Sequence, residues 1–251
     1  MHVRDLESDP ALPIATGQQT GLTNAESKLG QHQAQTVHSY REFSRPFALA
    51  PDLSLTERCV AAAAIAVLSL PVACVLLAVR VLSGESPLVA HRRVGLNGKP
   101  LWVLKIRTMW TRDSKAGHSK GWIEYLRETT VPVVKRGRDP RVTSSFASMC
   151  RRLSIDELPQ LVHIVRGEMR LAGPRPLTQH ELDLYYGETA AELLSVPPGI
   201  TGLWQIMGRN DLTYSQRRRL DLFFVRRRSA RLYWLVLLRT PACVLRGRGV
   251  A

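Results

Sequence analysis

The longest apolar stretch of the chain runs from Cys59 to Val79 and contains no charged residue. A helix rises about 1.5 Å per residue, so this stretch is about as long as the hydrocarbon core of a bilayer is thick, roughly 30 Å. We therefore predict a membrane-inserted helix within residues 51–84. Pro71 should kink that helix, and the nearby Ser69 hydroxyl can bond a carbonyl freed by the kink. Two arrangements stay open: a kinked helix that spans the bilayer, and one that enters a single leaflet and turns back.

The polar and apolar positions on either side of this stretch predict two further parts. Residues 1–50 are rich in Gln, Thr, Ser and His and lack periodicity, which predicts a disordered extension. Residues 85–251 have the mixed pattern of a folded domain. At its start, apolar runs over 87–90 and 101–104 flank the turn signal Asn97-Gly98, which predicts a β-hairpin.

Helical periodicity dominates the rest of this domain. We predict helices over 148–166, with Gly167 as a stop, and over 178–194, and loops over 111–142 and 197–202. From Ser215 onward, arginine clusters alternate with apolar residues, which is typical of an amphipathic segment at a membrane interface or of a charged face over a core. The predicted fold is therefore α+β and mostly helical.

The net charge of the chain limits the kinds of molecule that it is expected to bind. The 251 residues include 35 Lys and Arg against 21 Asp and Glu, a net charge of +14, which favours an anionic partner: nucleic acid, an anionic membrane surface or a phosphorylated substrate. Nucleic acid is the weakest of these, because no DNA- or RNA-binding motif is present. The four cysteines form no C-x-x-C pair and the histidines lack ligand spacing, which argues against a disulfide framework and a structural zinc site.

Candidate chemistry centres on Asp156 and Glu157, two adjacent carboxylates that follow Arg151 closely. Neighbouring arginines should hold a carboxylate ionised, and an ionised Asp can act as a nucleophile or a Mg²⁺ ligand. A second interpretation is local: Ser154-x-x-Glu157 is also a capping box that starts a helix. Under that interpretation Pro159 would interrupt the helix, whereas with Asp156 as the cap it would fall in the tolerated first turn. The local pattern leaves both open.

Several separated motifs make the chain resemble the bacterial sugar transferases, the monotopic phosphoglycosyl transferases, over residues 55–250. They are Ser69-Leu70-Pro71, Lys105 through Met109, Asp139 through Thr143, Ser154 through Leu161, Gly173-Pro174-Arg175-Pro176 and Pro198 through Gln205. The tail, with Gly208 through Asp211 and Leu245 through Gly249, is similar to the branch that initiates exopolysaccharide synthesis.

The resemblance implies an enzyme of the bacterial inner membrane with a re-entrant helix and a catalytic domain on the cytoplasmic face. It implies transfer of a sugar 1-phosphate from a UDP-sugar to undecaprenyl phosphate with release of UMP. A hexose, galactose or glucose, is favoured as the sugar. Asp156 then maps onto the nucleophile, and Glu157 onto the partner that helps to hold Mg²⁺. Candidate substrate-binding residues around the phosphates are Lys105, Arg107, Arg151, Pro174 and Arg175.

The chain departs from the family pattern at several positions. His91 stands where Gln is usual, His163 where Asn is common, and Arg170 where Ser is typical. None of these touches the Asp156-Glu157 pair, but they could alter substrate contacts.

Two other functions stay open. A membrane-tethered scaffold or nucleic-acid-binding protein would use the positive charge alone, and a degenerate family member would act only in assembly. The pattern does not determine whether the chain forms a homo-oligomer. Loss of UMP release on substitution of Asp156 would separate the enzyme from both.

Overall fold

The computed structural model describes residues 51–110, 121–126, 144–208 and 212–246. These residues are mostly helical, with two small sheets and one long apolar helix at the N-terminal end. The predicted extension over residues 1–50 and the Asp139–Thr143 motif lie outside the described residues.

Helix α2 (Pro51–Ser83) closely matches the predicted membrane segment. By length and composition, residues 54–83 could cross a membrane: an 18-residue window within them has a mean hydropathy of 2.6, and only 6% of that window is buried. A core helix of a soluble protein would bury most of its apolar side chains, whereas Val67 and Leu70 here are 76% and 73% exposed. The helix therefore fits a membrane location.

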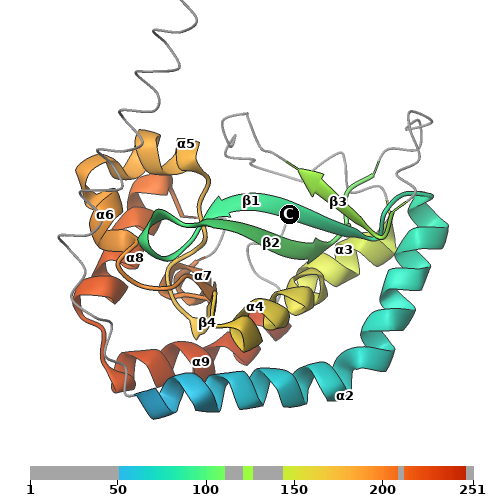
Figure 1. The fold of residues 1–251 in the computed structure, drawn as a ribbon, viewed down its shortest axis with the longest axis horizontal. Helices are drawn as coiled ribbons and strands as arrows, with labels where there is room; N and C mark the ends of the chain where they lie inside the picture. Colours follow the sequence, from blue (N-terminus) through green and yellow to red (C-terminus); the bar gives the residue numbers. More distant parts are fainter. Residues whose placement is uncertain (1–50, 111–120, 127–143, 209–211, 247–251) are drawn as a thin grey trace, which may run out of the picture. The chain divides into compact units, whose positions relative to one another are not determined.

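Pro71 lies inside α2 and the Ser69 hydroxyl donates to the carbonyl of Ala66 at 2.9 Å. Figure 1 shows that the two halves of α2 run in different directions, as expected where a proline removes a helix hydrogen bond. Each half is attached to the globule. Ala61 packs with Leu161 and Met169, and Val79 packs with Ile106.

The predicted hairpin is confirmed. Strands β1 (Leu88–Val94) and β2 (Pro100–Ile106) pair in antiparallel register, with His91 opposite Val103. Asn97 and Gly98 both adopt positive φ in the connection, where Asn and Gly are the favoured residues.

A third strand, β3 (Ile123–Leu126), pairs in parallel with β1 and gives the sheet order β2-β1-β3. The prediction of a loop with short helical patches over residues 111–142 is therefore wrong at these four positions, and most of that range lies outside the described residues. Four residues between polar stretches carry too short a pattern to be recognised as a strand, and their pairing with β1 is not local.

Three short helices lie against the hairpin and α2. They are α3 (Ser145–Arg152), the 3₁₀ helix η2 (Ile155–Gln160) and α4 (Leu161–Arg166), which ends at Gly167 with φ +77° as predicted. Leu161 and Ile164 of α4 form one core with Leu101 and Val103 of β2. Figure 1 shows this helical layer, in yellow, between the hairpin and α2.

A second, two-stranded parallel sheet joins β4 (Arg170–Ala172) to β5 (Gly199–Thr201). The predicted loop over residues 197–202 is wrong where β5 forms. The predicted single helix over 178–194 is instead divided into α5 (Gln179–Glu181), the π-helical η3 (Leu182–Tyr186), η4 (Gly187–Thr189) and α6 (Ala190–Leu193). Gly187 at φ +47° marks one of the breaks.

The C-terminal part comprises α7 (Leu203–Met207), α8 (Tyr214–Arg226) and α9 (Ala230–Arg246). Phe224 of α8 and Tyr233 and Val236 of α9 share a core with Leu203. On the other side of α9, Trp234 and Leu238 are exposed. The amphipathic pattern of the tail therefore reflects both a core face and an exposed apolar face.

One buried ion pair joins α2 to β4. Glu57, 3% exposed, accepts from Arg170 Nη1 at 2.6 Å and from the backbone amide of Leu171 at 3.0 Å. We expect Glu57→Gln to lower the free energy of unfolding by about 2 kcal/mol, because it removes the negative charge beside a half-buried guanidinium and replaces one of the two acceptor oxygens by an NH₂ donor. Thermal unfolding in one detergent would measure the change.

Glu188→Gln is the matched control, since Glu188 is exposed on η4. It should change the unfolding free energy by less than about 0.5 kcal/mol. Equal effects of the two substitutions would contradict a stabilising role for the Glu57–Arg170 pair.

Candidate functional site

The two adjacent carboxylates lie in the first turn of η2. Ser154, just before it, has φ 55° and makes no side-chain capping bond, so the capping-box interpretation is wrong. Asp156 is not the cap either, since it lies inside η2. Pro159 is accommodated because η2 is a 3₁₀ helix that gives way to α4 two residues later. The left-handed conformation of Ser154 ends α3 and starts the 3₁₀ turn that carries Asp156 and Glu157.

Strand β2 supplies the first cation. The ammonium of Lys105 donates to Glu157 Oε1 at 2.9 Å, and both side chains keep about a quarter of their surface exposed. An ion pair open to solvent contributes little to stability. Because the ion pair lies beside Asp156, we interpret it as part of the candidate site and not as a stabilising contact of the fold.

The environment of Asp156 raises the pKa of its carboxyl from 3.8 to about 6. Burial is the largest cause. Lys105 opposes it, the Glu157 charge adds to it, and Arg151 opposes it. The neighbouring cations favour the ionised form, as expected, but they do not bring the pKa down to its usual value, because desolvation outweighs them. Asp156 is poised to change its ionisation near neutral pH, as groups at catalytic sites often are.

Arg151, in the last turn of α3, acts on Asp156 electrostatically and lowers the pKa of that carboxyl. Its own buried Nε atom makes no hydrogen bond to any described residue. The structure thus brings the predicted residues Lys105, Arg151, Asp156 and Glu157 together.

A buried histidine fixes the strand that carries Lys105. His163 of α4 accepts a hydrogen bond from the Leu104 amide at Nε2 (3.3 Å), while Nδ1 lies 2.6 Å from Glu168 Oε2. With Nε2 as the acceptor, Nδ1 carries the hydrogen and donates it to Glu168. The departure from Asn at this position therefore has a structural role.

Close backbone contact between β4 and β5 positions Arg175. The Gly199 amide donates to the Pro174 carbonyl at 2.9 Å, and a Cβ on Gly173 would lie 2.7 Å from the Gly199 nitrogen. Side chains larger than hydrogen would separate the strands at this point. Pro174 is buried and contributes its carbonyl, whereas the Arg175 side chain is half-buried and faces the pocket.

A pocket lies between the hairpin, η2 and the β4–β5 sheet. It is lined by Lys105 and Glu157 together with His91, Arg93, Val103, Gln160, Arg175, Pro176, Gly199, Ile200 and Gln205. Sequence reasoning did not assign Arg93, Gln160 or Gln205 to the site. His91 and Arg93 are two positions apart in β1 and therefore lie on the same face of the strand. Strand periodicity could have placed them together once the hairpin was predicted. Gln205 Nε2 donates to the Ile200 carbonyl at 2.8 Å, a contact with no sequence signal.

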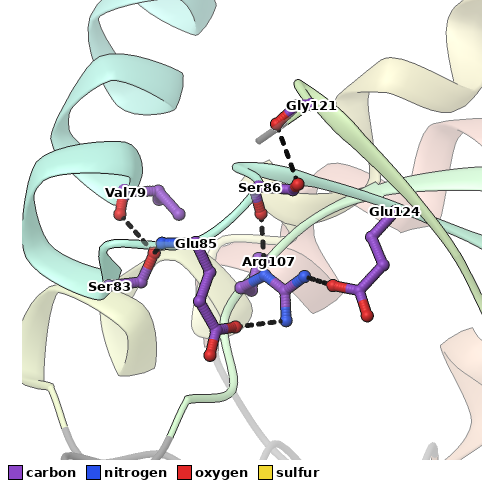
Figure 2. A network of polar contacts seen from close by, with 7 residues as sticks. All are labelled: Val79, Ser83, Glu85, Ser86, Arg107, Gly121 and Glu124. Atoms are coloured by element: carbon purple, nitrogen blue, oxygen red, sulfur yellow. Dashed lines mark hydrogen bonds and ion pairs between the residues drawn. The ribbon is translucent and has the colours of Figure 1, made fainter. Parts of the chain in front are cut away.

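Arg107 lies apart from this pocket. Figure 2 shows its guanidinium between Glu85 and Glu124, with Nη1 2.7 Å from Glu85 and Nη2 bonded to Glu124, while Nε donates to the Ser86 carbonyl at 2.7 Å. Arg107 thereby joins the end of β2 to β3 and to the segment after α2. The structure does not bring it to the other predicted substrate-binding residues.

Comparisons with known proteins point to one family. Residues 53–247 match the family model described as bacterial sugar transferase. The chain is 41% identical over 172 residues to "Exopolysaccharide production protein ExoY" of Sinorhizobium fredii, covering 66% of this chain and 73% of the relative. It is 36% identical over 200 residues to "UDP-glucose:undecaprenyl-phosphate glucose-1-phosphate transferase" of Caulobacter vibrioides, covering 74% and 68%.

A third relative is longer. Over 220 residues the chain is 36% identical to "UDP-galactose-lipid carrier transferase" of Erwinia amylovora, which covers 84% of this chain but 42% of the relative. The family match spans the membrane helix, the hairpin, the Asp156-Glu157 pair and the C-terminal helices. This chain belongs to the bacterial sugar transferase family and is a transferase.

Proposed function

We propose that the chain transfers a hexose 1-phosphate from a UDP-sugar to undecaprenyl phosphate, releases UMP, and so initiates exopolysaccharide synthesis at the cytoplasmic face of the inner membrane. One observation carries the proposal: a half-buried carboxyl, Asp156, lies beside the Lys105–Glu157 ion pair, and that ion pair lines a pocket together with Arg175. The names of the Caulobacter and Erwinia relatives, a glucose-1-phosphate transferase and a UDP-galactose-lipid carrier transferase, support these substrates. Galactose and glucose stay equal candidates.

The proposed reaction has two displacements. A carboxylate oxygen of Asp156 attacks the phosphorus that carries the sugar; the bond to the UMP oxygen breaks, and UMP leaves with the electron pair. An oxygen of undecaprenyl phosphate then attacks the same phosphorus and frees the Asp156 carboxylate. Division into two steps lets each bulky anionic substrate react with the enzyme in turn. Lys105, Arg151 and Arg175 offset the charge on the phosphates.

The residues present fit Mg²⁺. This ion is usually held by one or two carboxylates and by substrate phosphates rather than by a complete protein cage. Glu157 and Asp156 are adjacent acidic side chains, and the described residues contain no group of three or more metal-ligating side chains. Glu157 would hold the ion, which when bound neutralises phosphate charge. Lys105 keeps the Glu157 carboxylate oriented toward the site.

The proposed arrangement in the membrane is re-entrant. The kinked α2 is attached to the same globule through both of its halves, by Ala61 and by Val79. A helix that left on the opposite side of the bilayer could not return to one globule. Single cysteines placed before residue 59 and after residue 79, labelled from one side of the membrane, would test this; labelling from opposite sides would contradict it.

The experiment that tests the function uses membranes containing the full chain, UDP-galactose or UDP-glucose, and undecaprenyl phosphate. We expect UMP release that depends on Mg²⁺ and is lost on chelation with EDTA. Formation of the lipid-linked sugar phosphate should accompany it. Absence of UMP release with both sugars and with other UDP-sugars would contradict the proposal.

The acid side of the pH profile follows from Asp156. The nucleophile must be deprotonated, and its pKa is about 6. The rate of UMP release at low UDP-sugar concentration should therefore fall about tenfold per pH unit below pH 6 and level off above pH 7. The measurement follows the single turnover of UMP release without lipid acceptor, because the second pKa of a phosphate monoester also lies near 6.

Thermal unfolding over the same pH range provides the control, since acid unfolding would imitate a loss of rate. A profile that stays level down to pH 5 in a folded enzyme would contradict this environment for Asp156.

A further inference from the structure

Trp204 of α7 lies against two arginine side chains. It is 4% exposed, and the guanidinium carbons of Arg175 and Arg217 lie 5.3 and 5.0 Å from its ring centre. Arg217, from α8, also lies 5.4 Å from the ring centre of Tyr214. Cation–π contacts of this kind fix the plane of a guanidinium and leave its N–H edge available.

Neither arginine makes an ion pair with a carboxylate of the described residues. The buried Nε atom of Arg217 has no hydrogen-bond partner among them. The pKa of Arg217 is lowered, first by burial and then by the charge of Arg175. Two like charges held close together at a half-buried position cost free energy unless an anion joins them.

Two carboxyl groups lie near the arginines, but neither forms an ion pair with a guanidinium group of the described residues; Asp221 bonds to the backbone of Arg175 and not to its side chain. Asp221, one turn after Arg217, is buried and accepts from the Tyr186 hydroxyl at 3.0 Å. Burial raises the pKa of Asp221 to about 7, so this group carries only part of a negative charge near neutral pH. Glu181 accepts from the amide and hydroxyl of Thr178 in a capping box. Two guanidinium charges thus face one carboxylate, Glu181, and one partly ionised carboxyl, Asp221, which leaves a small excess of positive charge.

Arg175 connects this cluster to the pocket. It lines the same pocket as Lys105 and Glu157. A cationic surface thus continues from the Asp156-Glu157 pair through Arg175 to Arg217. The fork of a guanidinium suits phosphate oxygens better than a lysine does, because it offers two parallel N–H donors.

We propose that Arg175 and Arg217, oriented by Trp204, together hold one phosphate group of a substrate, and that Arg217 is a binding residue of this enzyme. The proposal rests on the proposed function, in which two substrates carry phosphate: the UDP-sugar through its diphosphate and undecaprenyl phosphate through its terminal group. Both present the same chemistry to a pair of guanidinium groups.

Arg217→Gln tests the proposal in two assays with one preparation of the full chain. The first follows UMP release from the UDP-sugar without lipid acceptor; the second follows transfer to undecaprenyl phosphate. We expect the concentration for half-maximal rate to rise about tenfold or more for one substrate. A rise for the UDP-sugar assigns the site to the diphosphate, and a rise for the lipid alone assigns it to the acceptor phosphate.

Arg219→Gln is the matched control, because Arg219 lies two residues along α8 with its side chain exposed. It removes the same charge and should change either concentration less than twofold. Arg217→Lys covers the case in which Arg217→Gln does not fold: it keeps the charge but loses the planar fork, and we expect a rise of about threefold to tenfold.

No change in affinity for either substrate with folded Arg217 variants would overturn the proposal, as would equal changes in Arg219→Gln. Neither result would affect the proposed function, which is tested by UMP release from the unsubstituted enzyme.

Discussion

Asp156→Asn is expected to lower the rate of UMP release by at least about 10⁴-fold, the scale seen when a nucleophile is removed from an enzyme that forms a covalent intermediate. The amide has nearly the shape of the carboxyl but offers no anionic oxygen to attack phosphorus. Since burial already favours the neutral form of this side chain, the substitution should be tolerated by the fold. UMP release from membranes, measured at pH 7.5, checks the prediction.

Asp183→Asn is the control for this substitution, because Asp183 is exposed and bonds only to Gln179 among the contacts of the described residues. It should leave the rate within twofold. Incubation with a UDP-sugar labelled in the sugar, without acceptor, should also leave label on the unsubstituted protein and none on Asp156→Asn. Retained UMP release by folded Asp156→Asn would exclude Asp156 as the nucleophile.

The features of the fold that sequence reasoning predicted are those with strong local signals. The apolar run and Pro71 indicated a kinked α2, and Asn97-Gly98 indicated the β1–β2 hairpin. Strands β3 and β5 were missed because each is only three or four residues long and is defined by its partner, not by its own pattern. Pairing between distant segments is not encoded in local periodicity.

The candidate site shows the same division between local and tertiary information. The sequence shows that Asp156 and Glu157 are adjacent and that basic residues are present. It does not show which basic residue pairs with which carboxylate: Lys105 bonds to Glu157, 52 positions away. Arg107, two residues further along the chain, instead bonds to Glu85 and Glu124. Side chains separated by two positions in or near a strand can meet quite different neighbours once the strand ends.

Electrostatics was the hardest property to predict. Counting the nearby arginines predicted an ionised carboxylate and no opposing effect, because charge is visible in a sequence and burial is not. In the folded chain desolvation raises the pKa of Asp156 in spite of Lys105 and Arg151. The same imbalance appears at Asp221, whose complete burial raises its pKa to about 7 beside two arginines. The tertiary structure decides which of two opposing effects is larger.

Lys105→Met is expected to lower the rate of UMP release by about 10²- to 10³-fold, the range for loss of one preorganised donor that stabilises developing charge. Lys105 has two effects at this site. It offsets negative charge on the phosphates, and it lowers the pKa of Asp156. Its removal should therefore slow the reaction at every pH and also move the acid side of the pH profile to higher pH.

The shift in the pH profile separates these effects from a structural one. If Lys105 only anchored Glu157 through their 2.9 Å contact, its loss would lower the rate without moving the profile. Lys105→Arg keeps the charge and should retain most of the profile's position. Lys99→Met, at an exposed position after the hairpin turn, removes a charge elsewhere and should change neither rate nor profile. An unchanged pH profile in Lys105→Met would mean that this cation does not act on Asp156. The rise in the pKa of Asp156 caused by burial would then be opposed by no positive charge from β2.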